Sequence, residues 1–144
     1  MYKRILVALE NSRADHTLLP HITAFARMCG DSTLLLVHVA DGWAARNYDS
    51  LQLVDSEEMR ADREYLTKTA EKLNAEGVSV ETRLVLGDPA QQILRTAAAE
   101  QCDLIAMTSH GHRFLGDLLF GSTIEVVRHR TDIPLLIVRA SGDK

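Results

Sequence analysis

The stretch from Asp103 to Thr123, DLIAMTSHGHRFLGDLLFGST, combines residue types and spacings that could do chemistry. An apolar run typical of a buried strand breaks into Thr108 and Gly111. Gly121 and Ser122 then precede a helical pattern. Glycine lets a backbone approach a ligand closely, and a helix N-terminus presents unpaired N–H groups with a partial positive charge. The order strand, glycine-bearing loop, helix start therefore predicts a place for phosphate.

Ser122 and Glu125 have the spacing of a capping box, which predicts that a helix begins at Ser122. Such a cap forms with or without phosphate. The flanking glycines favour a ligand, because a loop that only enters a helix has no need of Gly111. Arg113 in the same loop could neutralise phosphate through two parallel hydrogen bonds, or it could lie in solvent.

Other residues that could bind metal or react have ordinary explanations. His110 and His112 lie close together, but no third ligand is evident, so we expect a structural or solvated pair and no metal. Cys29 and Cys102 belong to no C-x-x-C pair and are expected to be buried free thiols. His38 lies inside an apolar run and is expected to be a hydrogen-bonded core histidine.

Five apolar runs have the length and composition of strands that are covered on both faces: residues 3–9, 33–39, 78–86, 103–108 and 135–138. The third run alternates with polar residues, which predicts a wetter face or an edge position. Four helical patterns separate the runs. The first contains Pro20, which predicts a start later than Ser12 or a kink, and the second runs from Asp55 to about Ala75. The third follows a cap at Asp88, and the fourth starts at Ser122.

Strands alternating with helices predict one α/β domain over residues 1–144, an open five-stranded parallel sheet with helices on both faces. In such sheets ligands bind beyond the carboxyl ends of the strands, where the strand order reverses. If the first and fourth strands are central neighbours, Glu10 and the turn from Thr108 to Gly111 meet at that point.

The composition excludes some partners. Of 144 residues, 46% are apolar and 25% charged, as in soluble globular proteins. A net charge of −4 gives no electrostatic reason to expect nucleic acid or an anionic membrane as partner. No apolar run approaches the ~20 residues of a membrane span, and Met1 to Lys3 lead directly into a strand, so we expect a cytoplasmic protein.

The chain resembles the universal stress protein family along nearly its whole length. The family's signature is a glycine, two residues, a glycine, nine residues, then Gly-Ser or Gly-Thr. That register falls here on Thr108, Gly111, Gly121 and Ser122, within TSHGHRFLGDLLFGST. Supporting matches are ILVALENS, LLLVHV, LGDPAQQIL and PLLIVRA. The resemblance implies a Rossmann-like fold of the adenine nucleotide alpha-hydrolase type, with strand order 3-2-1-4-5.

Members with this signature bind ATP, with or without Mg²⁺, and the resemblance implies a nucleotide site here. Its expected residues are Glu10, Val39, Thr108, Gly111, Arg113, Gly121, Ser122 and Thr123. Gly111, Gly121 and Ser122 would hold the phosphates, and Val39 would offer its backbone to adenine. Glu10 occupies the site of the family's usual Asp. Thr108 replaces the first glycine, and its β-branched side chain narrows the approach to the ribose and disfavours positive φ.

The resemblance implies a universal stress protein that binds an adenine nucleotide in the stress response and forms homodimers through the strand Leu135–Val138. The alternative is a member that has lost the nucleotide, as Thr108 suggests, and acts as a protein-interaction module. No Walker motif, nucleophile elbow or Cys/His metal cluster indicates an enzyme. At most we expect slow ATP hydrolysis, with Glu10 positioning Mg²⁺.

Overall fold

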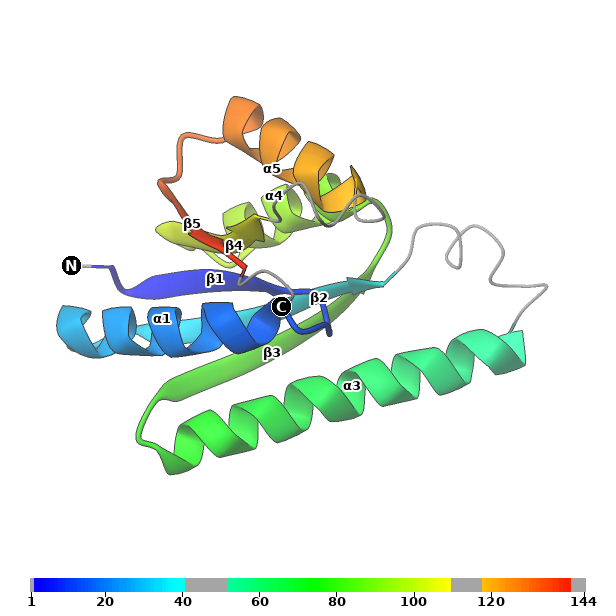
Figure 1. Ribbon diagram of the computed structural model, residues 1–144, viewed down its shortest axis with the longest axis horizontal. Helices are drawn as coiled ribbons and strands as arrows, with labels where there is room; N and C mark the ends of the chain where they lie inside the picture. The colour runs from blue at the N-terminus through cyan, green and yellow to red at the C-terminus, as the bar shows by residue number, and fades with distance from the viewer. Residues whose placement is uncertain (1, 41–51, 110–117, 141–144) are drawn as a thin grey trace.

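The computed structural model describes residues 2–40, 52–109 and 118–140, with backbone alone for 52–56 and 118–122. Strands and helices alternate along these residues (Figure 1). The strands are β1 (Arg4–Leu9), β2 (Thr33–Ala40), β3 (Ser79–Leu86), β4 (Leu104–Ser109) and β5 (Leu135–Arg139). The helices are α1 (Asp15–Cys29), α3 (Gln52–Ala75), α4 (Pro89–Ala99) and α5 (Leu118–Arg130). Each predicted strand is present, with bounds that differ by only one or two residues.

The strands form one parallel sheet in the order β3-β2-β1-β4-β5, as predicted. β1 lies at the centre, and each of its residues from Arg4 to Leu9 has a partner in β2. β3, the most polar strand, lies at one edge, where one side of the strand needs no apolar neighbour.

The helices cover the two faces of the sheet in pairs. Figure 1 shows α1 and α3 on one face and α4 and α5 on the other. Successive residues of a strand point to opposite faces, so β1 contributes to both halves of the core. Ile5 and Val7 pack with Leu18 of α1 and Leu66 of α3, whereas Leu6 belongs to the core beneath α4 and α5. No helix in the described part of the chain is long and apolar enough to cross a membrane.

Two helix starts were predicted from caps, and one of them is wrong. Asp88 caps α4 as expected, since its carboxylate accepts a hydrogen bond from the N–H of Gln91 at 3.0 Å. α5, in contrast, begins at Leu118, so Ser122 lies within the helix and cannot be its N-cap. The carboxylate of Glu125 accepts a hydrogen bond from Arg128 at 2.9 Å instead of closing a capping box.

α1 begins at Asp15, later than Ser12, and continues through Pro20. The later start was one of the two alternatives that Pro20 predicted. Gly30 ends the helix with a φ of 94°, a conformation that glycine adopts without steric cost.

Candidate functional site

β1 and β4 stop pairing before they reach the carboxyl edge of the sheet. Their pairing ends at Val7 with Ala106, whereas β4 continues beside β5 as far as Ser109 paired with Arg139. The last residues of β4 therefore have a strand neighbour on one side only. This is the point where the strand order reverses, and it is where open α/β sheets bind ligands.

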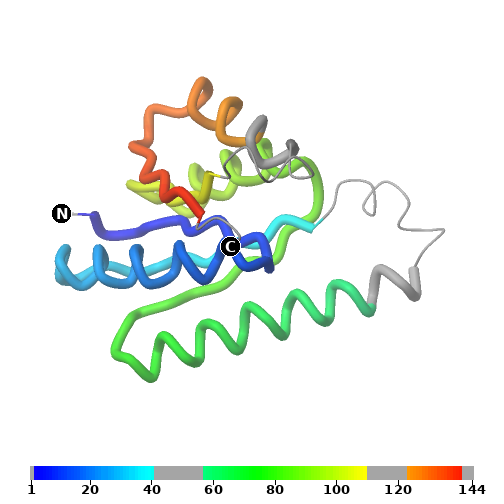
Figure 2. The backbone as a smooth tube through the Cα atoms, viewed as in Figure 1, coloured from blue at the N-terminus to red at the C-terminus, as the bar shows by residue number. Residues whose placement is uncertain are grey.

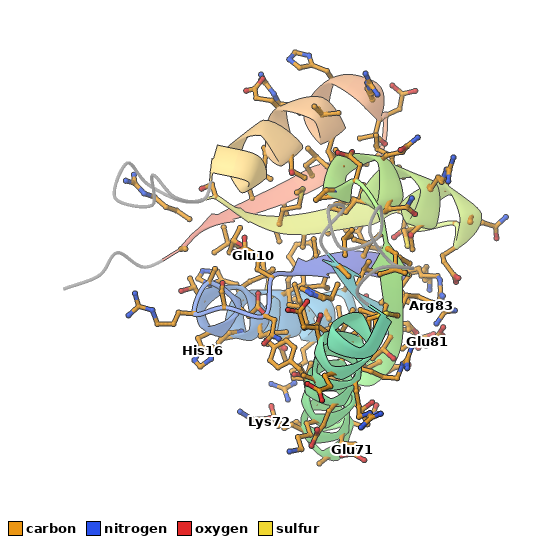
Figure 3. The ribbon with its side chains drawn as sticks, turned by 90° about the vertical axis from the view of Figure 1, so that its right-hand side faces the viewer. Glu10, His16, Glu71, Lys72, Glu81 and Arg83 are labelled. Carbon is orange, nitrogen blue, oxygen red and sulfur yellow. The ribbon has the colours of Figure 1, made fainter. Side chains whose placement is uncertain are left out.

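Glu10 and Thr108 meet across this divergence. The Thr108 hydroxyl donates to Oε2 of Glu10 at 3.1 Å, and the hydroxyl of Ser12 donates to Oε1 at 3.1 Å. Figure 3 shows Glu10 on the side of the β1–α1 turn that faces β4. The expectation that Glu10 and the end of the fourth strand lie together is confirmed.

Thr108 has ordinary strand geometry. Among the described residues other than glycine, only Asn11 and Gln101 have a positive φ, so the backbone at Thr108 carries none of the strain that its β-branched side chain would cause there. The side chain is 2% exposed. The buried side chain fills the carboxyl edge of the sheet beside β1, and its hydroxyl already donates a hydrogen bond to Glu10.

A buried carboxylate holds the turn that carries Glu10. Asp15 is fully buried, and its two oxygens accept hydrogen bonds from the N–H groups of Glu10 and Asn11, both at 2.9 Å. The Tyr65 hydroxyl of α3 donates to the same carboxylate at 2.5 Å. Burial, followed by this hydrogen bond, raises the pKa of Tyr65 above its ordinary value. Both N–H groups are taken, so this turn is not a phosphate-binding nest.

The turn is also tied to β2 and α3 through polar side chains. The amide of Asn11 donates to Oδ1 of Asp62 at 3.0 Å, and Nε2 of His38 lies 3.3 Å from Oδ2 of Asp62. Nδ1 of His38 lies 3.0 Å from the carbonyl oxygen of Leu9. His38 is therefore the hydrogen-bonded core histidine that was expected. The part played by Asp15, Tyr65 and Asp62 was not predicted.

Of the other residues expected to contact a nucleotide, the structure describes some and not others. β2 pairs with β1 only as far as His38, so Val39 has β3 on one side and no strand on the other. Gly121 and Ser122 lie in α5, and Thr123 is buried there. Gly111 and Arg113, with His110 and His112, lie outside the described residues.

A second charged cluster lies at the opposite, amino edge of the sheet. Arg4 donates two hydrogen bonds to Glu81 at 3.0 Å and one to Glu100 at 2.6 Å. The hydrogen bonds from Arg4 lower the pKa of both carboxyl groups, and those to Glu81 and Glu100 raise the pKa of Arg4. Nearby, burial raises the pKa of the Cys102 thiol to about 11. Each charge in this cluster has a partner, which is typical of a structural site.

Comparisons with known proteins agree with this geometry. A model of the Universal stress protein family matches residues 1–139. Universal stress protein MJ0577 of Methanocaldococcus jannaschii is 30% identical, and the match covers 96% of each chain. The protein therefore belongs to the universal stress protein family.

Solved structures share its fold. The structure of MJ0577 superimposes with a TM-score of 0.86 and 26% identity over 99% of both chains. A universal stress protein from Archaeoglobus fulgidus, solved in complex with dAMP, gives a TM-score of 0.70 and 22% identity over 95% of this chain and 98% of that one.

Proposed function

We propose that this protein is a cytoplasmic stress-response regulator that binds an adenine nucleotide, ATP with or without Mg²⁺, and acts as a homodimer through β5. The observation that carries the proposal is the divergence of β1 and β4, with the Glu10 carboxylate between their ends. A relative of the same fold has been solved with dAMP. The nucleotide would supply phosphates whose presence or loss distinguishes two states of the protein.

The described residues fit the base and ribose end of a nucleotide. Val39 has backbone without a strand neighbour on its β1 side, which suits hydrogen bonding to adenine. The Glu10 carboxylate accepts hydrogen bonds and therefore suits ribose hydroxyls or a hard cation. Phosphate would be held by Gly111, Arg113, Gly121 and Ser122, and not by buried Thr123 or by the β1–α1 turn, where Asp15 takes both N–H groups.

A second candidate function is a protein-interaction module without nucleotide. The observation that favours it is the hydrogen bond from Thr108 to Glu10, because the two side chains satisfy each other in the absence of a ligand. A nucleotide hydroxyl would have to compete with Thr108 for the carboxylate.

The test begins with the freshly purified protein, which is denatured so that any released nucleotide can be identified by chromatography and mass spectrometry. The stripped protein is then titrated with Mg-ATP by calorimetry. We expect saturable binding that Glu10→Gln weakens. The matched control is Glu71→Gln, which removes a carboxylate from the exposed surface of α3 (Figure 3) and should leave the affinity unchanged.

A protein that carries no adenylate and gives no heat with ATP, ADP or AMP would overturn the nucleotide part and leave the interaction module. Equal affinity in both Gln variants would show that the nucleotide binds away from Glu10. Substitution of Gly121 by a bulky residue tests the phosphate end separately.

A further inference from the structure

A groove of about 460 Å³ lies between α1 and α3, on the face of the sheet opposite α4 and α5. Figure 2 shows both helices below β1, α1 in blue and α3 in green. The volume is within the ~300–1,000 Å³ of typical small-molecule sites. Leu19, Pro20, Ala24 and Leu73 give it apolar walls, so it could hold the body of an organic molecule.

α1 presents one unsatisfied polar group to this groove. Thr23 is 5% exposed, and its hydroxyl has no hydrogen-bond partner among the described residues. A helical threonine commonly donates to the carbonyl three or four residues earlier, and this one does not. A ligand that accepts a hydrogen bond here would satisfy the Thr23 hydroxyl, which has no partner among the described residues.

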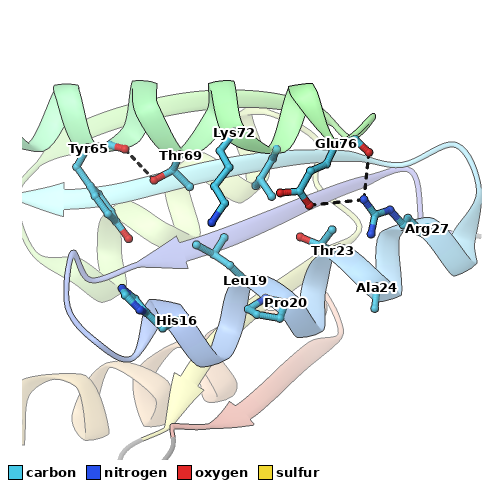
Figure 4. A pocket seen from close by; sticks show the side chains of 11 residues that line it. His16, Leu19, Pro20, Thr23, Ala24, Arg27, Tyr65, Thr69, Lys72 and Glu76 are labelled. Carbon is cyan, nitrogen blue, oxygen red and sulfur yellow. Dashed lines mark hydrogen bonds and ion pairs between the residues drawn. The ribbon is translucent and has the colours of Figure 1, made fainter.

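α3 presents an uncompensated positive charge. Figure 4 shows the Lys72 side chain extending from α3 toward α1 and ending beside Leu19. Its ammonium group makes no hydrogen bond or ion pair with any residue that the structure describes. At the end of the groove Arg27 donates to the carbonyl of Glu76 at 3.0 Å and lies 3.7 Å from its carboxylate, so these two charges balance. Lys72, Arg27 and Glu76 together therefore give the lining one net positive charge.

We infer that this groove is a second ligand site, separate from the proposed nucleotide site, for a small monoanion with an apolar body, such as an aliphatic carboxylic acid. Lys72 pairs with the carboxylate, Thr23 donates a hydrogen bond to it, and the apolar body lies against Leu19, Pro20 and Leu73. A single cation with one hydroxyl suits a carboxylate, whereas phosphate groups are more often held by several donors, including arginine and helix N-termini.

The experiment is a titration of the isotope-labelled, nucleotide-free full chain with sodium hexanoate and, separately, with uncharged hexanamide, followed by amide chemical shifts. We expect hexanoate to give saturable shifts that map to α1 and α3 along the groove. Lys72→Gln should lower the affinity for hexanoate by about tenfold, the loss of one charge-assisted hydrogen bond, and remove the preference over hexanamide.

Lys68→Gln is the matched control, because it makes the same change on α3 outside the groove, where Lys68 pairs with Glu64 at 3.0 Å. It should bind hexanoate as the wild type does. Thr23→Val keeps the side-chain shape and should weaken hexanoate without loss of stability, since the hydroxyl it removes has no partner.

Three results would overturn the inference: no saturable shifts with either probe, shifts that map away from α1 and α3, or equal losses in the two lysine variants. None of these results depends on ATP, so the groove and the nucleotide site can fail independently.

Discussion

The Thr108 hydroxyl donates a hydrogen bond to the Glu10 carboxylate at 3.1 Å, beyond the last residues through which β1 and β4 pair. The bond joins the two central strands where their backbones no longer do. It also keeps the carboxylate at the carboxyl edge of the sheet, on the side where a ligand would enter. Thr108, which replaces a glycine of the family signature, therefore has a structural role of its own.

Thr108→Val should lower the free energy of unfolding by about 1–2 kcal/mol, because it preserves the side-chain shape and removes a hydrogen bond to a charged group. Urea unfolding monitored by circular dichroism measures the change. Thr33→Val is a suitable control, since the Thr33 hydroxyl bonds Ser79 at an exposed position. Similar values for the two variants would mean that the Glu10 contact contributes no more than a surface hydrogen bond.

Tyr65→Phe should cost about 2 kcal/mol of unfolding free energy, because it removes one of three hydrogen bonds to the fully buried Asp15 carboxylate. The turn at Glu10 and Asn11 should also loosen, which faster hydrogen exchange of these two amides would reveal.

Tyr2→Phe makes the same chemical change at a hydroxyl that bonds no described residue, and it should be nearly neutral. If Tyr65→Phe is equally neutral, Asp15 holds the turn through backbone N–H groups alone.

The sheet could be predicted from the sequence because buried parallel strands have short apolar sequences, and glycine and polar residues separate these from one another. Residues 5–9, for example, are all apolar, and right-handed crossovers leave few strand orders. The meeting of Glu10 and Thr108 follows once β1 and β4 are central neighbours, since Glu10 directly follows β1 and Thr108 lies one residue before the end of β4.

The rest depended on contacts that no local pattern encodes. Asp15 and Tyr65 are far apart in sequence, and an aspartate in the first turn of a helix reads as an ordinary favourable charge. The capping box at Ser122 failed because its spacing also occurs within a helix, where Glu125 has Arg128 to pair with. The groove that Lys72 lines depends on how α1 and α3 pack against each other, and the sequence pattern of either helix alone does not predict that packing.

The cluster around Arg4 predicts a pH dependence of stability. Hydrogen bonds from Arg4 lower the pKa of Glu81 and Glu100 below the ordinary value of 4.5, so the folded state holds these carboxyl protons less tightly than the unfolded state. The stabilisation is therefore fully present above about pH 4.5 and is lost as the pH falls through the lowered values.

Arg4→Met retains an apolar side chain and removes the charge, and it should reduce the unfolding free energy at neutral pH. Its difference from the wild type should shrink in titrations carried below about pH 4.5. Arg128→Met, which breaks an exposed pair with Glu125 at 2.9 Å, should have a much smaller effect at neutral pH. A difference between Arg4→Met and wild type that is constant with pH would mean that packing, not charge, accounts for it.

If the protein forms a dimer through β5, a charged substitution on the exposed side of this strand should prevent dimer formation. β5 is an edge strand, so its outer backbone groups have no strand partner within the described chain and could pair with a second copy. Ile137 is 39% exposed on this strand, whereas Val138 is 8% exposed and packs in the core. Ile137→Glu should therefore give monomers in sedimentation velocity without unfolding the protein, as circular dichroism would verify.

Met28→Glu provides the comparison, because Met28 is 86% exposed on α1 and the substitution adds the same charge outside β5. It should sediment as the wild type does. A charge at Val138 would be a poorer probe, since burying it unfolds the core and separates the subunits by a different route. If Ile137→Glu remains dimeric, β5 is not the interface. If the wild type is monomeric at every concentration, the exposed Ile137 requires another explanation.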